Sequence, residues 1–130
     1  MRRQTFKPEG ARADLPYSPA VRGDGTVYIS GHVPVDPQTR QVVGGGIGPQ
    51  TRQTLENLKA TAALAGVSFA DVVKVNIFLT DMSDFAEMNK VYREYFPTDP
   101  PARTTVGTPA LSHPDMKVEI EMIALAPEGR

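Results

Sequence analysis

The segment that decides the fold is residues 73–79, which reads Val73-Lys74-Val75-Asn76-Ile77-Phe78-Leu79. The apolar side chains at its odd-numbered positions face one way, and Lys74, Asn76 and Phe78 face the other. This alternation predicts a β-strand with one buried face. Segments with helical signals precede and follow the strand, so we expect a sheet whose buried face is covered by helices.

Two flanking segments predict helices. Residues 49–65 start with Pro49, which suits a first turn, and stop before Gly66. Their apolar side chains recur at helical spacing, at Leu55, Leu58, Ala62 and Ala65. The second helix follows residues 81–83, is capped by Ser83 or Asp84, and ends at Pro97. Its expected buried stripe is Phe85, Met88, Tyr92 and Tyr95.

The remaining strands complete one sheet. Residues 17–30 predict a hairpin with its turn at residues 22–25. Further strands are expected at 2–6 on an edge, 41–43, 103–106 and 117–125. The order is β-β-β-α-β-α-β-β, and the connection through the second helix makes strands 73–79 and 103–106 parallel. The fold class is α+β, one mixed sheet with two helices on one face.

Composition sets further bounds. The chain has 130 residues, which predicts a single domain over 1–130. It has no Cys and two His, so thiolate chemistry is excluded and we expect no metal site. The net charge of −1 makes a nucleic-acid partner improbable. No apolar run is long enough for a membrane span, and no apolar segment follows the basic residues 1–7, so we expect a cytoplasmic protein.

The sheet face away from the helices predicts an interface. Two helices cover only one face, and the other carries Phe78 and Ile123 beside charged and polar side chains. That mixture is too apolar for a wetted face and too charged for a core. We therefore expect this face to meet another copy of the chain, with polar sites set into the interface.

Arg103 and two glutamates are the main candidate site residues. Arg103 starts a strand behind Pro100 and Pro101, and its planar guanidinium suits a carboxylate ligand. A structural ion pair is the alternative. Glu119 and Glu121 lie on the face away from the helices, where either carboxylate can act as a general base on water. Solvated strand residues are the alternative, and alternation does not choose between the two.

Other polar residues are weaker candidates. Tyr17 and Ser30 flank the predicted hairpin, and Asn89 lies in the second helix; core packing, a turn role and plain exposure are the respective alternatives. The glycine-rich residues 44–48 lack the Lys-Ser/Thr of a phosphate loop and predict a loop with positive φ instead. His32 and His113 have no partners at a telling spacing and are expected to bond within loops.

Several motifs together resemble the RidA/YjgF family, also called the endoribonuclease L-PSP family, over nearly the whole chain. They are Leu15-Pro16-Tyr17-Ser18, residues 29–37, residues 54–58, residues 81–85 with Asn89, residues 101–106 and Val118-Glu119-Ile120-Glu121. The resemblance implies a chorismate-mutase-like fold and a homotrimer with active sites between subunits. It also implies hydrolysis of enamine and imine intermediates, such as 2-aminoacrylate, to 2-keto acids and ammonia, without a cofactor.

The resemblance assigns roles by position. Arg103 matches the residue that grips the substrate carboxylate, and Glu119, rather than Glu121, matches the one that places the attacking water. Tyr17, Ser30, Gly31, Asn89 and Thr105 match residues of the substrate pocket.

Two positions depart from the family pattern. Thr105 stands where Cys is frequent, and His32 stands where Gln is common. Two rival functions stay open, a carboxylate-binding module without turnover and an endoribonuclease. The near-zero net charge speaks against the ribonuclease.

Overall fold

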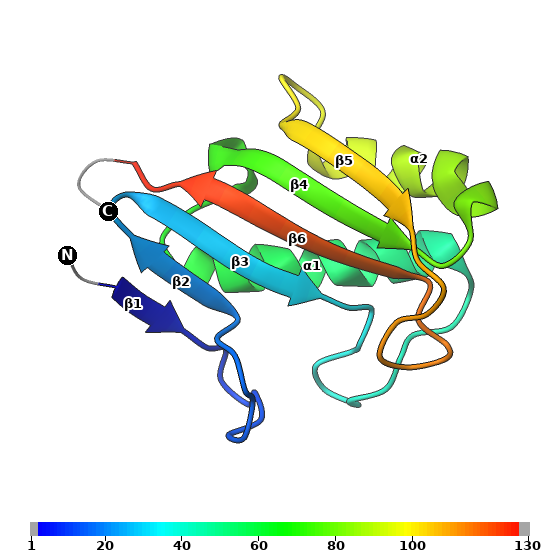
Figure 1. Cartoon of the computed structure of the whole chain (residues 1–130), viewed down its shortest axis with the longest axis horizontal. Helices are drawn as coiled ribbons and strands as arrows, with labels where there is room; N and C mark the ends of the chain where they lie inside the picture. Colours follow the sequence, from blue (N-terminus) through cyan, green and yellow to red (C-terminus); the bar gives the residue numbers. More distant parts are fainter. Residues whose placement is uncertain (1–2, 128–130) are drawn as a thin grey trace.

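The computed structural model describes residues 3–127 and shows a six-stranded mixed sheet with two helices on one face (Figure 1). The strands are β1 (Arg3–Phe6), β2 (Ala20–Gly23), β3 (Thr26–His32), β4 (Val72–Leu79), β5 (Ala102–Gly107) and β6 (Val118–Leu125). The helices are α1 (Ile47–Leu64) and α2 (Phe85–Tyr95). The predicted α+β class and order of elements are confirmed.

β4 is the second strand from one edge of the sheet, whose order is β1-β2-β3-β6-β4-β5. It pairs parallel with β5, as predicted, and antiparallel with β6. The predicted alternation fails at its start, because a register shift between Val72 and Lys74 puts Val72 in the core and leaves Val73 41% exposed. From Val75 to Leu79 the alternation is confirmed.

The hairpin of β2 and β3 turns through two residues, Asp24 and Gly25. Both have positive φ, 50° and 81°, as expected of a tight turn that matches strand twist. β1 forms the predicted edge strand, although residue 2 lies outside the described residues. The strand expected at 41–43 is wrong, because only an isolated bridge joins Val35 and Val42.

α1 begins at Ile47 rather than at Pro49. Before it, Gly45 and Gly46 have φ values of 93° and 91°, so the prediction of positive φ in this glycine-rich loop is confirmed. The predicted buried stripe is also confirmed: Leu55, Leu58, Ala62 and Ala65 are all buried in the core.

α2 differs from its prediction at the start. A 3₁₀ turn, η2 (Met82–Asp84), precedes it, and Asp81 caps that turn by accepting from the backbone N–H of Ser83, so neither predicted cap is used. The helix buries Met88, Val91 and Tyr92. Phe85, predicted to be buried, is 37% exposed because it packs over β5, the edge strand.

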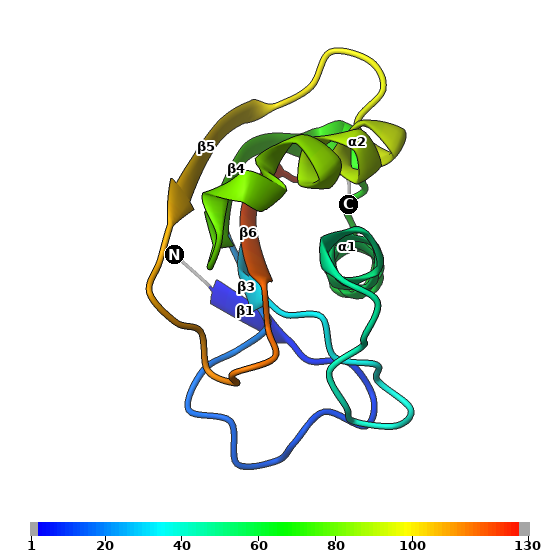
Figure 2. The same cartoon turned by 90° about the vertical axis from the view of Figure 1, so that its right-hand side faces the viewer.

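The two faces of the sheet differ as predicted. Figure 2 shows α1 and α2 on the same side of the sheet. The opposite side, called here the open face, carries Tyr28, Lys74, Asn76, Phe78, Thr104, Val106, Glu119, Glu121 and Ile123. Tyr28 is 53% exposed and Val106 is 42% exposed. Within residues 3–127 no helix is long and apolar enough to cross a membrane.

Candidate functional site

The candidate site residues fall on opposite faces of the sheet. Arg103 pairs in register with Val75, whose side chain is fully buried beneath the helices. Glu119 pairs with Phe78 and alternates with buried neighbours, so its side chain belongs to the open face. Because side chains in register share a face, a single chain keeps the guanidinium and the carboxylate on opposite sides of the sheet.

The guanidinium of Arg103 lies against aromatic rings instead of a carboxylate. Its central carbon is 4.8 Å from the ring centre of Tyr92 and 5.6 Å from that of Phe85. Among residues 3–127 it forms no ion pair and no hydrogen bond with another side chain. The structural ion pair considered above is therefore absent within the described chain. The N–H donors of the guanidinium stay free for a ligand while the rings hold its plane.

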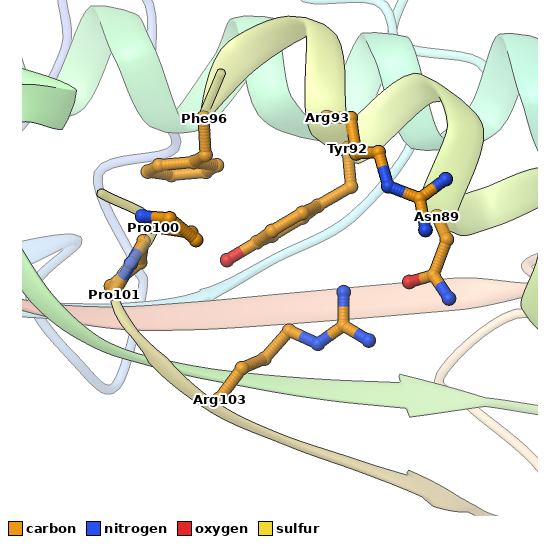
Figure 3. A pocket seen from close by; sticks show the side chains of 7 residues that line it. All are labelled: Asn89, Tyr92, Arg93, Phe96, Pro100, Pro101 and Arg103. Atoms are coloured by element: carbon orange, nitrogen blue, oxygen red, sulfur yellow. The ribbon is translucent and has the colours of Figure 1, made fainter. Parts of the chain in front are cut away.

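A pocket of about 250 Å³ opens beside Arg103 (Figure 3). α2 supplies one wall, and the segment entering β5 supplies Pro100 and Pro101, which restrict the approach to the strand as expected. In Figure 3 the guanidinium lies between the Tyr92 ring and the Asn89 amide. The complete lining is Asn89, Tyr92, Arg93, Phe96, Pro100, Pro101 and Arg103.

Three buried polar atoms of α2 and β5 have no hydrogen-bond partner among residues 3–127. They are Asn89 Oδ1, the Tyr92 hydroxyl and Thr105 Oγ1. Thr105 follows Arg103 by two positions on the same strand face, and Asn89 precedes Tyr92 by about one helical turn. Buried polar groups are rarely left unpaired, so these atoms mark a place where a ligand or water supplies the missing partner.

Tyr92 lines the pocket of the candidate site, although its helical spacing predicted only a place in the core. Burial raises the pKa of its phenol to about 12, an effect that the charge of Arg103 partly opposes. The phenol is therefore neutral near pH 7 and offers its ring to the guanidinium. The one available signal was its position, three residues after Asn89 on the helix.

The carboxylate of Glu119 occupies space that is open because residue 31 is a glycine and has no side chain. A Cβ built on Gly31 would stand 2.0 Å from Glu119 Oε2, so any larger residue would displace the carboxylate. Burial, and second the neighbouring Glu121, raise the pKa of Glu119. Within the described residues this carboxylate accepts no hydrogen bond, whereas Glu121 accepts one from Asn76 Nδ2 at 3.0 Å. This difference, which alternation did not show, favours Glu119 as the reactive carboxylate.

Ser30 ties the loop before β2 to the end of β3. Its hydroxyl donates to the Ser18 carbonyl at 2.7 Å, and its N–H donates to the Pro19 carbonyl at 2.9 Å. Tyr17 lies on this loop and is 54% exposed. The hydroxyl of Ser30 is thus already used as a donor, and its observed effect is to position the loop that carries Tyr17.

The candidate site residues therefore form two separate clusters, called here half-sites. The first, the guanidinium half-site, consists of Arg103, Tyr92, Asn89 and Thr105. The second, the carboxylate half-site, consists of Glu119, Gly31, Ser30 and the Tyr17 loop. Among residues 3–127 no three His, Asp or Glu side chains gather as a set of metal ligands.

Comparison with known proteins identifies the family. The model of the family described as Endoribonuclease L-PSP matches residues 9–126. The chain belongs to this family. A RutC family protein of Pyrococcus horikoshii is 49% identical over 109 residues, which are 84% of this chain and 86% of that protein. The 2-iminobutanoate/2-iminopropanoate deaminase of mouse is 44% identical over 110 residues, which are 85% of this chain and 81% of the deaminase.

A solved structure in the same family has the same fold. RidA from the Antarctic bacterium Psychrobacter is 42% identical, with a TM-score of 0.87 over 94% of this chain and 98% of that protein. The predicted family and fold are therefore both confirmed. Mouse and human relatives of this chain are named 2-iminobutanoate/2-iminopropanoate deaminase.

Proposed function

We propose that this protein hydrolyses 2-imino acids, and the enamines that tautomerise to them, to 2-keto acids and ammonia. The proposal rests on two ionic groups that have no ion-pair partner among residues 3–127. They are the Arg103 guanidinium, which lies over the Tyr92 ring, and the Glu119 carboxylate, whose pKa is raised by burial. The name of the mouse relative, an iminobutanoate and iminopropanoate deaminase, supports the same reaction class. Arg103 and Glu119 are the proposed catalytic residues.

The proposed active site is shared by two copies of the chain. Arg103 and Glu119 belong to opposite faces of one sheet, so one substrate touches both only if a second copy brings its open face to the first copy's β5 edge. The apolar and charged mixture on the open face supports such packing. We propose a homotrimer, for which light scattering at micromolar concentration tests the mass. The proposal includes a cytoplasmic location, which microscopy of a tagged chain tests.

The proposed mechanism is a hydrolysis by a positioned water. Arg103 binds the substrate carboxylate through two parallel N–H donors and so fixes the adjacent C=N carbon. Glu119 of the neighbouring copy accepts a proton as water attacks that carbon; the new C–O bond forms and the C=N π electrons move to nitrogen. The protonated Glu119 returns the proton to nitrogen, which gives the carbinolamine. Glu119 then takes the proton of the new hydroxyl and passes it to the amino nitrogen, so the C–O bond becomes a carbonyl as the C–N bond breaks, and ammonia and the 2-keto acid leave.

The remaining residues have positioning roles in this proposal. Asn89 and Thr105 offer polar atoms beside the guanidinium, and Tyr17 and Ser30 shape the wall around the carboxylate half-site. Free imines already hydrolyse in water, so the protein has to lower the activation free energy by only a few kcal/mol. Each 1.4 kcal/mol raises the hydrolysis rate about tenfold. Positioned ionic groups of this kind are sufficient for that change.

Two matched substitutions test the proposal. Glu119→Gln keeps the shape of the side chain and removes the base, so turnover of an imine generated in the assay should fall by about 10²-fold or more. Glu121→Gln removes a charge from the same strand face and should change turnover less than threefold. Keto-acid production by protein of unchanged oligomeric mass is the measurement. Equal turnover in both variants, or the reverse ranking, would contradict the assignment.

The two rival functions give different outcomes. A carboxylate-binding module would bind 2-keto acids through Arg103 and release no ammonia in a single turnover. An endoribonuclease would cleave RNA and show binding that weakens steeply with salt. The net charge of −1 gives little attraction for phosphates.

A further inference from the structure

His32 links the end of β3 to α1. Its Nδ1 is 2.7 Å from the carbonyl oxygen of Ser30, and its Nε2 is 2.8 Å from Thr61 Oγ1. A carbonyl only accepts, so Nδ1 carries the proton and donates to Ser30, and Nε2 accepts from the Thr61 hydroxyl. Thr61 is fully buried in α1, which gives the ring a fixed anchor in the core.

The residues held by His32 are those that surround Glu119. The pairing of β3 with β6 breaks between Ile29 and His32, so Ser30 and Gly31 form an irregularity, a bulge, in the strand. Bulges redirect a strand and are held only where local contacts fix them. The Glu119 carboxylate lies over Gly31, and Ser30 holds the loop that carries Tyr17.

We propose that His32 is a positioning residue for the hydrolytic reaction. By fixing the Ser30 carbonyl to α1 through Thr61, it sets the bulge over which Glu119 lies and the loop that carries Tyr17. The inference rests on the proposed function, because it assigns His32 an effect on the base of that reaction. His32 touches neither substrate nor water in this role; it acts through the backbone of Ser30 and Gly31.

The electrostatics agree with a neutral, structural imidazole. Burial lowers the pKa of His32, and the hydrogen bond to Ser30 only partly opposes this shift. The ring is thus neutral near pH 7 and keeps the tautomer that the two hydrogen bonds require. Glu119 shares the open face with Glu121 on β6, Lys74 on β4 and Tyr28 on β3, and of these Glu121 contributes to its raised pKa.

His32→Leu tests the proposal, with His113→Leu as the matched control on an exposed loop and His32→Gln as the variant that retains a donor and an acceptor. We expect kcat to fall about tenfold in His32→Leu, with KM changed less than twofold because Arg103 still grips the carboxylate. His32→Gln should stay within threefold of the wild type and His113→Leu within twofold.

Two further readouts separate positioning from loss of folded protein. Titration with 2-oxobutanoate should give the wild-type number of binding sites in His32→Leu. The acid limb of its kcat/KM profile should move to lower pH, because a carboxylate released from its half-buried place regains a more ordinary pKa. If His32→Leu does not fold, Thr61→Val removes one end of the link and should lower kcat about threefold, again without a change in KM.

Three results for His32→Leu would overturn the inference. They are a folded protein with the wild-type kcat, a fall in kcat no larger than the fall in the number of 2-oxobutanoate binding sites, and a kcat/KM profile whose acid limb lies at the wild-type pH. Each of these, obtained while Glu119→Gln is inactive, removes the role of His32 and leaves the proposed function standing. Full activity in Glu119→Gln instead removes the proposed function itself.

Discussion

The guanidinium half-site and the carboxylate half-site are held by different means. Arg103 lies on the edge strand and is held by contact with the rings of Tyr92 and Phe85, and its donors form no hydrogen bond to a side chain within the described part of the chain. Glu119 lies on an inner strand, and hydrogen bonds through Ser30 and His32 fix the backbone beneath it. Aromatic contact tolerates small shifts, whereas a hydrogen-bonded bulge does not.

The difference matches the task proposed for each group. A substrate carboxylate is strongly attracted to a guanidinium, so ring contact is enough to hold the plane ready. A general base has to place one water against one carbon, and small errors in position are costly. Among residues 3–127 neither ionic group has an ion-pair partner, but the backbone around Glu119 is held by hydrogen bonds, whereas buried polar atoms of Asn89, Tyr92 and Thr105 around Arg103 lack a partner. The comparison therefore predicts that substitutions in the first half-site act on binding and those in the second act on turnover.

The largest effect is expected for Arg103→Lys. Lysine keeps the charge but loses the planar fork, so catalytic efficiency should fall by about 10²-fold or more while the protein stays folded. Steady-state assays with melting curves are the measurement. Arg52→Lys, which alters a surface ion pair with Glu94, is the matched control and should keep full turnover. A folded Arg103→Lys protein with nearly full activity would remove the carboxylate-grip role.

A smaller effect is expected at Tyr92. Tyr92→Leu removes the ring beneath the guanidinium and should raise KM about tenfold, the scale of a partly desolvated cation–π contact. Tyr92→Phe keeps the ring and removes an unpaired hydroxyl, so KM should change less than threefold. If both variants lose affinity equally, the hydroxyl contacts the substrate directly and stacking is not the main support of this half-site.

Alternation and helical spacing predicted the six strands of the sheet, both helices and the open face, because those patterns follow directly from which side chains are buried, but they also predicted a strand at 41–43 that is only an isolated bridge. They failed where local geometry departs from the regular period, at the Val72–Lys74 register shift and at the 3₁₀ turn before α2. For the candidate site, the resemblance to the family motifs singled out Arg103 and Glu119 as the expected catalytic residues. The sequence did not reveal Tyr92, since a buried helix aromatic looks the same whether or not an arginine stacks on it.

The choice between Glu119 and Glu121 shows the same limit. The two-residue period of a strand places both glutamates on the open face and does not distinguish between them. Only the three-dimensional structure shows that Asn76 hydrogen-bonds one carboxylate and that Gly31 makes room for the other. The opposite placement of Arg103 and Glu119 also needed the register of β4 with β5 and with β6, which no single segment contains.

The smallest effect is on stability. The pKa of Glu119 is higher in the folded chain than the ordinary value of 4.5, so the folded state binds more protons between these two values and stability falls as pH rises through that window. Glu119→Gln removes the buried charge and should raise Tm by about 2–4 °C at pH 7. The gain should vanish below pH 4.5, where the wild-type carboxyl is neutral in both states.

Calorimetry of Glu119→Gln and Glu121→Gln at pH 4 and pH 7 checks this expectation. Glu121→Gln should gain less, because Asn76 already stabilises that carboxylate. A Tm for Glu119→Gln that is lower at pH 7 than the wild-type value would show that the carboxylate half-site stabilises the fold and is not strained for catalysis.

The central claim is that one active site takes Arg103 from one copy and Glu119 from another, and mixing two inactive variants tests it most directly. Arg103→Lys chains still supply Glu119, and Glu119→Gln chains still supply Arg103. When equal amounts are unfolded and reassembled together, about a quarter of the sites should combine both intact residues, so about a quarter of wild-type turnover should return. Turnover no greater than the sum of the separate variants, in reassembled protein shown to contain both chains, would contradict a shared site.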